Sequence, residues 1–312
     1  MRISKVVIFG GTGFVGQSLC EQLQRLGIQA TVPTRHPSKG TRLAHLPNVT
    51  VVPSPADDPA ALQTLIAGHD AVINLIAILH GTPAAFKQAH ITWPTQLADA
   101  CTAAHATHPL QHVVHVSALG ASPDAPSNYQ RSKAAGEAVW QAFTACPTTV
   151  LRPSVIFGAR DQFLNLFSKL VALTPILPLA GANTRFQPVW VNDVASAITH
   201  SLRAPRGTDE TRVIDCTGPD VFTLRELVQL TARWKHTRVW VINVPYAVAM
   251  MQAWVMEQLP GPTLMSRDNV RSLQVDNVAQ ASSLKDDALN MMTRTWGLSP
   301  TSLHAAAHLY RA

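Results

Sequence analysis

The first half of the chain alternates short apolar runs with longer amphipathic stretches. Runs of this kind are typical of buried strands, and the stretches between them repeat their apolar residues at helical spacing. The predicted strands cover residues 5–9, 29–33, 49–52, 71–75, 112–117 and 149–156. The predicted helices cover residues 16–26, 60–67, 86–104 and 127–146. Strands that alternate with helices over short connections predict an α/β fold, with a parallel sheet covered by helices.

The pattern loosens after residue 158, where several prolines interrupt it. The elements predicted there are a helix at 192–203, a strand at 212–216 and a helix at 223–234. Thr223 and Glu226 have the spacing of a capping box, in which each residue satisfies a backbone N–H at the start of a helix. We therefore predict a doubly wound parallel sheet followed by a smaller C-terminal lobe.

The longest uncharged apolar stretch, residues 239–256, approaches the length of a membrane span. Asn243, Pro245 and Gln252 interrupt it, and it divides into a predicted strand at 239–244 and a helix after Pro245. We expect no targeting segment at the start of the chain, because the first apolar run there is short. We therefore expect a cytoplasmic protein of bacterial type without a transmembrane segment. Peripheral contact of this helix with the inner membrane is the alternative.

Composition and charge exclude several classes of protein. Apolar residues make up 46% of the chain and charged residues 14%, which is typical of a globular protein rather than a disordered one. The net charge is +6, but the basic residues do not form runs, so we expect no nucleic-acid partner. Four cysteines without a CxxC spacing indicate free thiols. The thirteen histidines do not combine with acidic or thiolate ligands at zinc-like spacing, so no metal site is expected.

A glycine-rich loop follows the first predicted strand and opens the first helix. Its spacing satisfies G-x-G-x-x-G, in which glycines permit a tight turn, close approach to a pyrophosphate, and close packing of helix on strand. Free N–H groups at the helix start then bind the phosphates. The predicted cofactor-binding residues are Gly10, Gly11, Thr12, Gly13, Phe14, Val15 and Gly16. The sequence thus predicts a Rossmann-type dinucleotide-binding core at residues 1–158.

The remaining residues, 159–312, are predicted to form a substrate or partner lobe. Residues 188–245 partly return to the core, so the two parts are interleaved rather than joined by a linker.

The type of dinucleotide follows from the end of the second strand. NAD-preferring sites carry an acidic residue about 20 positions beyond the glycine loop, whereas this chain has none between Glu21 and Asp57. Arg35 instead follows the second strand, where a guanidinium suits the 2′-phosphate of NADP(H). We therefore predict NADP(H) over NAD(H), with an ordinary solvated arginine as the alternative.

A candidate catalytic group combines Ser117, Tyr129 and Lys133. Tyr129 and Lys133 lie four residues apart at the start of a predicted helix and share one face. We expect the lysine ammonium, together with a positive nicotinamide, to lower the pKa of the phenol from its usual value near 10. Tyr129 would then be the general acid or base, Lys133 its electrostatic partner and ribose anchor, and Ser117 the hydrogen-bond donor to a substrate carbonyl.

With these residues the chain resembles the short-chain dehydrogenase/reductases, in their extended or atypical branch. The resemblance rests on segments 10–16, 70–74, 117–120, 129–133, 151–158 and 188–195. It implies that the cofactor also contacts Leu75, Ile76, Ala77, Lys133 and Pro153. Two departures stand out: Ser54-Pro55 replaces the usual Gly-Asp, which puts the adenine contact there in doubt, and Ala77 replaces a glycine.

Segments 259–262, 268–269 and 273–278 resemble the subgroup that contains the NADPH-binding accessory subunit of respiratory complex I and its bacterial relatives. Our first hypothesis is an NADP(H)-dependent oxidoreductase or epimerase-like enzyme. It would act on a carbonyl or hydroxyl of a quinone or other lipid-like substrate. The second, implied by the subgroup, is a non-catalytic NADPH-binding protein with a structural, assembly or redox-sensing role in a protein complex. A third is a role in ubiquinone biosynthesis. The sequence leaves the substrate, the partner and the oligomeric state open.

Overall fold

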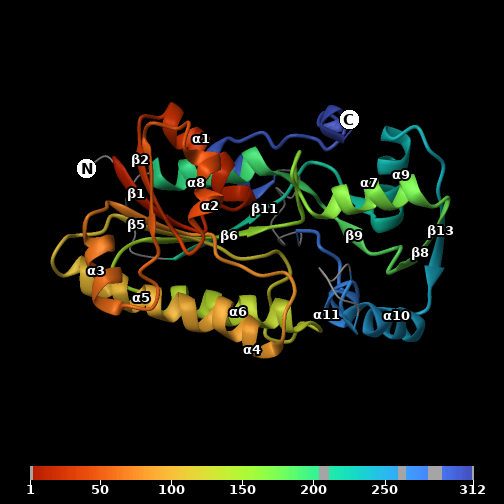
Figure 1. Cartoon of the computed structure of the whole chain (residues 1–312), viewed down its shortest axis with the longest axis horizontal. Coiled ribbons are helices and arrows are strands. Elements are labelled where there is room, and N and C mark those ends of the chain that lie inside the picture. The colour runs from red at the N-terminus through yellow and green to blue at the C-terminus, as the bar shows by residue number, and fades with distance from the viewer. Residues whose placement is uncertain (1–2, 204–210, 259–264, 280–289, 311–312) are drawn as a thin grey trace.

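A seven-stranded parallel sheet forms the centre of the computed structural model, which describes residues 3–203, 211–258, 265–279 and 290–310. Its strands are β1 (Lys5–Phe9), β2 (Gln29–Thr34), β3 (Val49–Pro53), β4 (Ala71–Asn74), β5 (His112–Val116), β6 (Thr148–Pro153) and β11 (Arg212–Cys216). The spatial order is β11-β6-β5-β4-β1-β2-β3, so the direction of winding reverses between β1 and β4 (Figure 1). The predicted doubly wound, Rossmann-like fold is confirmed.

Helices cover both faces of this sheet (Figure 1). On one face lie α1 (Phe14–Arg25) and α8 (Val191–Arg203), and on the other α3 (Pro59–Ala67), α5 (Trp93–His105) and α6 (Asn128–Gln141). Alternate residues of a strand point to opposite faces, and β1 shows this directly. Its Val6 and Ile8 belong to the same buried cluster as residues of α1 and α8, whereas Val7 and Phe9 pack with residues of α3 and α5.

The C-terminal lobe is built from shorter elements, and its core is separate from those of the sheet. They are α7 (Phe163–Leu173), β8 (Ile176–Ala180), β9 (Arg185–Phe186), β12 (Phe222–Thr223), α9 (Leu224–Trp234), β13 (Trp240–Val244), α10 (Tyr246–Gln258) and α11 (Arg267–Ser272). β13 pairs in parallel with β8, and β12 pairs antiparallel with β9. The predicted capping box at the start of α9 is confirmed.

Short elements complete the described chain. They are α2 (Pro37–Gly40), η1 (Thr41–Leu43), α4 (Pro83–Lys87), η2 (Gln88–Thr92), β7 (Ile156–Phe157), β10 (Val189–Trp190), α12 (Met291–Trp296) and η3 (Ala307–Tyr310). In the part of the chain that the structure describes, no helix is long and apolar enough to cross a membrane. All four cysteines lie in the described part of the chain, where they are buried and not joined in disulfides.

Two elements that were predicted as continuous are not: one helix is interrupted and one strand ends early. The predicted helix at 86–104 is interrupted by η2, a π-helical segment. There the chain passes very close to α6, since a Cβ on Gly136 would lie 2.1 Å from the carbonyl oxygen of His90. The predicted strand at 149–156 ends at Pro153. Ser154 Oγ and the N–H of Val155 then donate to Asn277, and Ile156 begins β7, which pairs with β10 in a separate sheet.

Candidate active site

The glycine-rich loop packs tightly against the ends of its neighbouring strands. Gly10 has φ +83°, and a Cβ there would lie 3.0 Å from the carbonyl carbon of Leu75. A Cβ on Gly16 would lie 2.4 Å from the Cα of Gly11. Only glycine at position 16 therefore allows α1 to pack this closely against the loop. The N-cap of α1 is Gly13, which makes no side-chain cap. The first amides of α1 are therefore free to bind an anion.

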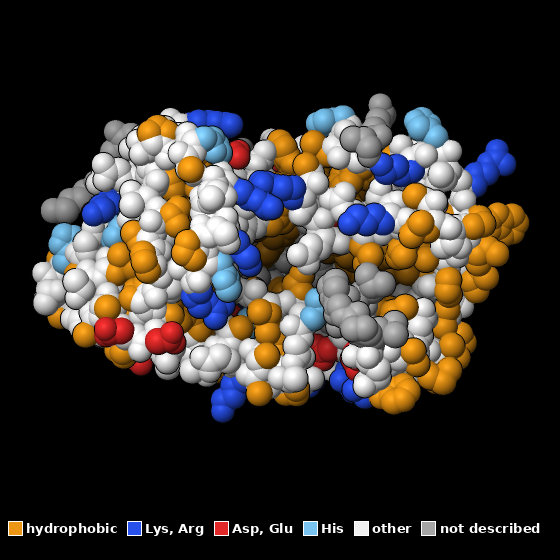
Figure 2. All heavy atoms as spheres, viewed as in Figure 1, with side chains coloured by type: hydrophobic (Ala, Val, Ile, Leu, Met, Phe, Trp, Pro, Cys, Tyr) orange, Lys and Arg blue, Asp and Glu red, His pale blue; other side chains and the backbone are white. Residues whose placement is uncertain are grey.

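These features fit the pyrophosphate of a dinucleotide. The loop lies at the carboxyl end of β1, beside the point where the strand order reverses, which is where open α/β sheets bind ligands. Arg35 follows β2 directly and is exposed. Figure 2 shows a hollow near the middle of this face, with Lys and Arg side chains at its rim. The positive charge at this rim suits phosphate groups.

The ends of β4 and β6 carry the other predicted cofactor contacts. The N–H of Leu75 donates to the carbonyl oxygen of Phe9 at 2.9 Å, and that of Ile76 donates to Asn74 Oδ1 at 3.2 Å. Ala77 is exposed next to them, and Pro153 ends β6. All of these residues lie at the carboxyl edge of the sheet. Asp58, which follows the atypical Ser54-Pro55, caps α3 by accepting from the N–H groups of Ala60 and Ala61.

Ser117 follows β5 at the same edge. Its backbone N–H donates to Leu151 on β6 at 2.7 Å, which fixes its position. Its hydroxyl is buried and has no partner in the described part of the chain. A buried hydroxyl without a partner costs free energy, so this atom suits a bound ligand that supplies one.

Lys133 is 1% exposed, and its Nζ donates to the carbonyl oxygen of Val116 at 2.8 Å. The structure thus brings Lys133 to the residue that precedes Ser117. Burial lowers the pKa of the ammonium to about 8, and the negative charge of Glu137 opposes this effect. Glu137 itself is held by Arg152, whose Nε donates to it at 2.9 Å. Lys133 is therefore still mostly a cation at neutral pH.

Tyr129 lies one turn before Lys133 on α6, and its ring contacts the rings of Phe86 and His90 edge-on. Burial raises the pKa of its phenol to about 12. This is opposite to the lowering that we expected from Lys133, whose ammonium donates to a backbone carbonyl. Without ligand, the phenol is therefore protonated and suits the donation of a proton rather than its removal.

His90 is a buried residue of η2 that the sequence analysis did not single out. Its Nε2 accepts from the N–H of Ile78 at 3.1 Å, so the ring proton lies on Nδ1, which donates to Ser132 Oγ at 2.8 Å. Ser132 in turn donates to the carbonyl oxygen of Tyr129. Burial, assisted by the charge of Lys133, lowers the pKa of His90 to about 3. This neutral ring therefore links the loop after β4 to the start of α6.

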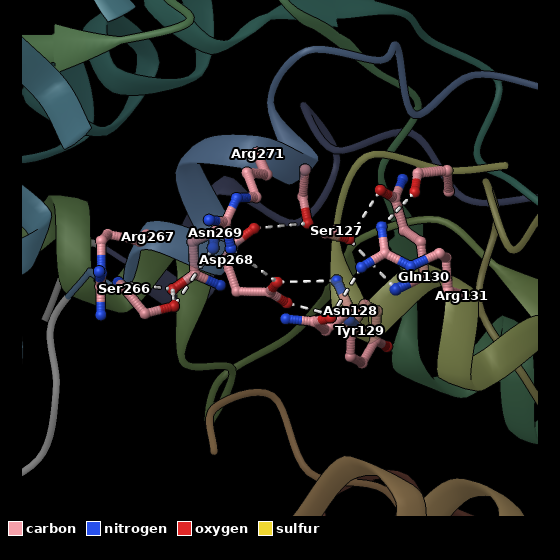
Figure 3. Close-up of polar contacts among 12 residues, drawn as sticks. Ser127, Asn128, Tyr129, Gln130, Arg131, Ser266, Arg267, Asp268, Asn269 and Arg271 are labelled. Carbon is pink, nitrogen blue, oxygen red and sulfur yellow. Dashed lines mark hydrogen bonds and ion pairs between the residues drawn. The ribbon is translucent and has the colours of Figure 1, made fainter. Parts of the chain in front are cut away.

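Asp268 on α11 reaches α6 from the C-terminal lobe (Figure 3). Its carboxylate oxygens accept from the backbone N–H groups of Asn128 and Tyr129 at 2.7 and 2.9 Å. Ser127 Oγ accepts from the N–H of Gln130. The first three amides of α6 are therefore all bound by side chains, two of them by the carboxylate of Asp268, a residue that is 9% exposed. Its negative charge also suits the positive end of the helix dipole.

Asn277 makes a second connection from the C-terminal segment. Its Oδ1 accepts from Ser154 Oγ at 2.6 Å and from the N–H of Val155, and its Nδ2 donates to the carbonyl oxygen of Leu119 at 3.0 Å. It thus joins the loop after Ser117 to the end of β6. Both Asp268 and Asn277 occur in segments used for the resemblance, whose other segment, 259–262, lies outside the described residues.

The family model described as "NAD dependent epimerase/dehydratase family" matches residues 6–216, which include the glycine loop and all three candidate catalytic residues. The chain belongs to the NAD-dependent epimerase/dehydratase family. Together with the resemblance to relatives from complex I, this confirms the extended branch and the subgroup expected from the sequence.

Two similar proteins differ in role. Subunit 9 of the mitochondrial NADH dehydrogenase (ubiquinone) 1 alpha subcomplex from Arabidopsis thaliana is 32% identical over 302 residues, covering 91% of this chain and 73% of that protein. A ceramide reductase from Caulobacter vibrioides (strain NA1000 / CB15N) is 32% identical over 258 residues, covering 80% and 78%.

Solved structures share the fold at low sequence identity. The structure titled MoeE5 in complex with UDP-glucuronic acid and NAD has a TM-score of 0.72 at 15% identity and covers 98% of this chain. It covers 97% of that chain. Another is UDP-glucuronic acid 4-epimerase from Bacillus cereus, in complex with UDP-glucuronic acid and NAD, with a TM-score of 0.70 at 16% identity and 98% of both chains covered.

Proposed function

We propose that this protein is an NADP(H)-dependent oxidoreductase that acts on a carbonyl or hydroxyl group of a lipid-like substrate. The glycine loop and the amides of α1 would hold the pyrophosphate, and Arg35 the 2′-phosphate. A nicotinamide bound there supplies or accepts a hydride. The family membership supports this cofactor class, and the relative named ceramide reductase supports a lipid-like substrate.

The three polar residues would divide the remaining work. In the direction of reduction, Ser117 Oγ donates a hydrogen bond to the substrate carbonyl oxygen and polarises it. As the carbonyl carbon gains a hydride, Tyr129 donates its phenolic proton to the same oxygen, so that an alcohol forms. The Lys133 ammonium stabilises the tyrosinate that remains until a proton from solvent replaces the one transferred. Burial raises the pKa of Tyr129, so the phenol carries its proton before the reaction, as a proton donor must.

The observation that carries the proposal is the buried Ser117 hydroxyl without a partner. A protein that only folds around a cofactor gains nothing from an unsatisfied hydroxyl next to a fully buried lysine. Such an arrangement is expected where a substrate oxygen completes the hydrogen bonds.

A second candidate function is supported by the similarity to complex I subunits over 91% of the chain. In this case the protein binds NADPH without turnover and acts by docking to a larger assembly. The two candidates make different predictions for cofactor exchange, because a turning-over enzyme must release its cofactor and a structural site need not.

The test starts with the purified full-length chain. Bound cofactor is identified by mass spectrometry after denaturation, and its affinity and exchange are measured by NADPH fluorescence. NADPH oxidation is then followed with a short-chain ubiquinone and with a long-chain ketone as acceptors. The enzyme proposal expects exchange within minutes and oxidation that depends on acceptor. NADPH that stays bound for hours, with neither acceptor consumed, would favour the docking role.

Tyr129→Phe removes only the phenolic hydroxyl. We expect it to lower turnover by about a hundredfold or more, since general acid catalysis contributes at least that much, with NADPH affinity unchanged. Turnover of Ser117→Ala is compared with that of the control variant Ser196→Ala. Ser196 lies on α8, outside the candidate site, and donates to Gln22. Turnover that is equal in wild type and Tyr129→Phe would refute the proposed mechanism.

A further inference from the structure

Helix α10 presents its large apolar side chains to solvent and its small ones to the protein. Ala249 and Ala253 are fully buried, whereas Met251, Trp254 and Val255 are 63%, 50% and 49% exposed. Surface helices ordinarily do the reverse and turn a polar face outward. Between Tyr246 and Met256 the helix contains no charged residue at all. Folding of the chain alone therefore gives no reason for this arrangement.

The neighbouring strands extend the same surface. Trp240 and Ile242 on β13 are 76% and 54% exposed, and Ile176, which is the register partner of Trp240 on β8, is 52% exposed. We call Ile176, Trp240, Ile242, Met251, Trp254 and Val255 the outer face. Figure 2 shows apolar side chains gathered along this end of the C-terminal lobe, around β13 and α10. Apolar surface of this extent on a soluble protein usually marks an interaction site.

The charges around the outer face indicate what covers it. The segments that build it, residues 163–180 and 233–258, contain four basic residues, Lys169, Arg233, Lys235 and Arg238, and one acidic residue, Glu257. Glu257 is neutralised by an ion pair with Arg267 at 2.8 Å. Basic residues beside exposed tryptophans are typical of protein surfaces that rest on anionic lipid, where the indole lies at the headgroup level.

We propose that the outer face binds the surface of an anionic lipid bilayer, with α10 lying in the plane of the membrane. The helix has 13 residues, too few to span, but its exposed side chains suit shallow insertion. The surrounding basic side chains add attraction to the headgroups. This proposal concerns the surface to which the protein binds, and it does not depend on enzymatic turnover.

The buried side of α10 is connected to the helix that carries Tyr129 and Lys133 by a short series of contacts. Ala249 and Ala253 pack against Ala180 and against Val270 of α11, the same helix whose Asp268 binds the start of α6. A pocket of about 270 Å³ opens at this junction. It is lined by residues 180–184, by the segment from Asn243 to Tyr246, and by Val270 of α11 with the two residues that follow this helix. If the proposed function holds, a lipid-like substrate would therefore pass from the bilayer into the protein at the C-terminal lobe.

Vesicle binding of the full-length chain tests the proposal. Sedimentation is compared for vesicles of phosphatidylcholine alone and of phosphatidylcholine with phosphatidylglycerol in equal parts. We expect binding to the anionic vesicles that weakens with salt. The double variant Met251→Ser, Trp254→Ser should weaken it about tenfold or more, because two inserted side chains are lost. The matched control is Val221→Ser, which changes a 47% exposed residue outside the outer face.

Three results would overturn the proposal: no binding to either vesicle, binding that the double variant leaves unchanged, or binding that Val221→Ser weakens equally. An oligomer in solution that the double variant dissociates, without vesicle binding, would assign the outer face to a second protein chain instead. NADPH titration of the double variant shows that it is folded. Tyr129→Phe should bind vesicles like wild type, so failure of the enzymatic proposal is distinguishable from failure of this one.

Discussion

Replacing Asp268 with alanine would release the start of the helix that carries Tyr129. The carboxylate accepts from two backbone N–H groups, those of Asn128 and Tyr129, at 2.7 and 2.9 Å (Figure 3). No other acceptor for them is provided by α6 itself, because the first amides of a helix have no partner within it. In the alanine variant, only water can accept hydrogen bonds from these two amides.

The magnitude follows from the two hydrogen bonds. An N–H donated to a charged acceptor contributes about 1.5–3 kcal/mol net, and water replaces part of this at half-buried amides. We therefore expect Asp268→Ala to lower the free energy of unfolding by about 2–3 kcal/mol, at or above the upper end of the losses of about 0.5–2 kcal/mol measured for helix caps, because two amides lose their acceptor. Asp268→Asn keeps one acceptor oxygen but loses the charge that the helix dipole favours, so its loss should be about 1–2 kcal/mol.

Hydrogen exchange resolves this change locally. With about 1.4 kcal/mol for each factor of ten, exchange of the Asn128 and Tyr129 amides should accelerate about 30- to 100-fold in Asp268→Ala. Urea unfolding of the same variants gives the global loss. If Tyr129 is the proton donor, turnover should fall while NADPH affinity stays near that of wild type, because the glycine loop is not touched.

Asp276→Asn is the matched control in the same C-terminal segment. Asp276 binds Arg185 at 2.8 Å, but its side chain is 39% exposed and that of Arg185 60%, so its removal should cost less than about 1 kcal/mol. Wild-type exchange at Asn128 and Tyr129 in Asp268→Ala, with an unchanged urea midpoint, would refute the assignment of Asp268 as the cap of α6.

Two further predictions concern the cofactor and pH. Arg35→Ala should weaken NADPH binding about tenfold or more while NADH binding changes little, because only NADPH has a 2′-phosphate; equal losses in fluorescence titrations would contradict the cofactor assignment. Stability should fall as pH drops below about 6.5, since burial keeps the pKa of His90 at about 3 and that of His115 also below its usual value. The unfolded chain then binds more protons than the folded one, and His90 alone contributes a loss of about 1.4 kcal/mol at about pH 5.5. Thermal unfolding between about pH 8 and pH 5 measures this, and a flat profile would show that these rings are charged in the folded protein.

The sequence was sufficient for the sheet and for the part of the site that lies on it. β1 and β11 have the predicted bounds, 5–9 and 212–216, because each contains consecutive apolar residues and ends just before a segment with glycine, at Gly10 and Gly218. A parallel sheet puts the carboxyl ends of its strands on one edge. Ser117 and the glycine loop therefore could be assigned to one site from their positions after strands, and the structure has both at that edge.

The contacts across the lobes could not be predicted in this way. Asp268 acts on residues about 140 positions earlier, and no local periodicity records such a contact. The π-helical η2 looks like ordinary helix in the sequence, because its cause is the close approach of α6 at Gly136. The raised pKa of Tyr129 depends on burial, which a spacing of four residues to Lys133 does not specify.

Because the chain returns to the central sheet after residue 158, the protein cannot be divided there into two parts that each keep a complete sheet. β11 extends the sheet beside β6, and α8 covers the face beside α1, yet both come after residue 158. A fragment ending there would expose the open edge of β6 and the apolar side chains that α8 covers. We therefore expect residues 1–158 alone not to fold stably. A change of substrate preference that keeps the sheet intact would have to be made in the loops between β6 and β11 or in the segment after β11.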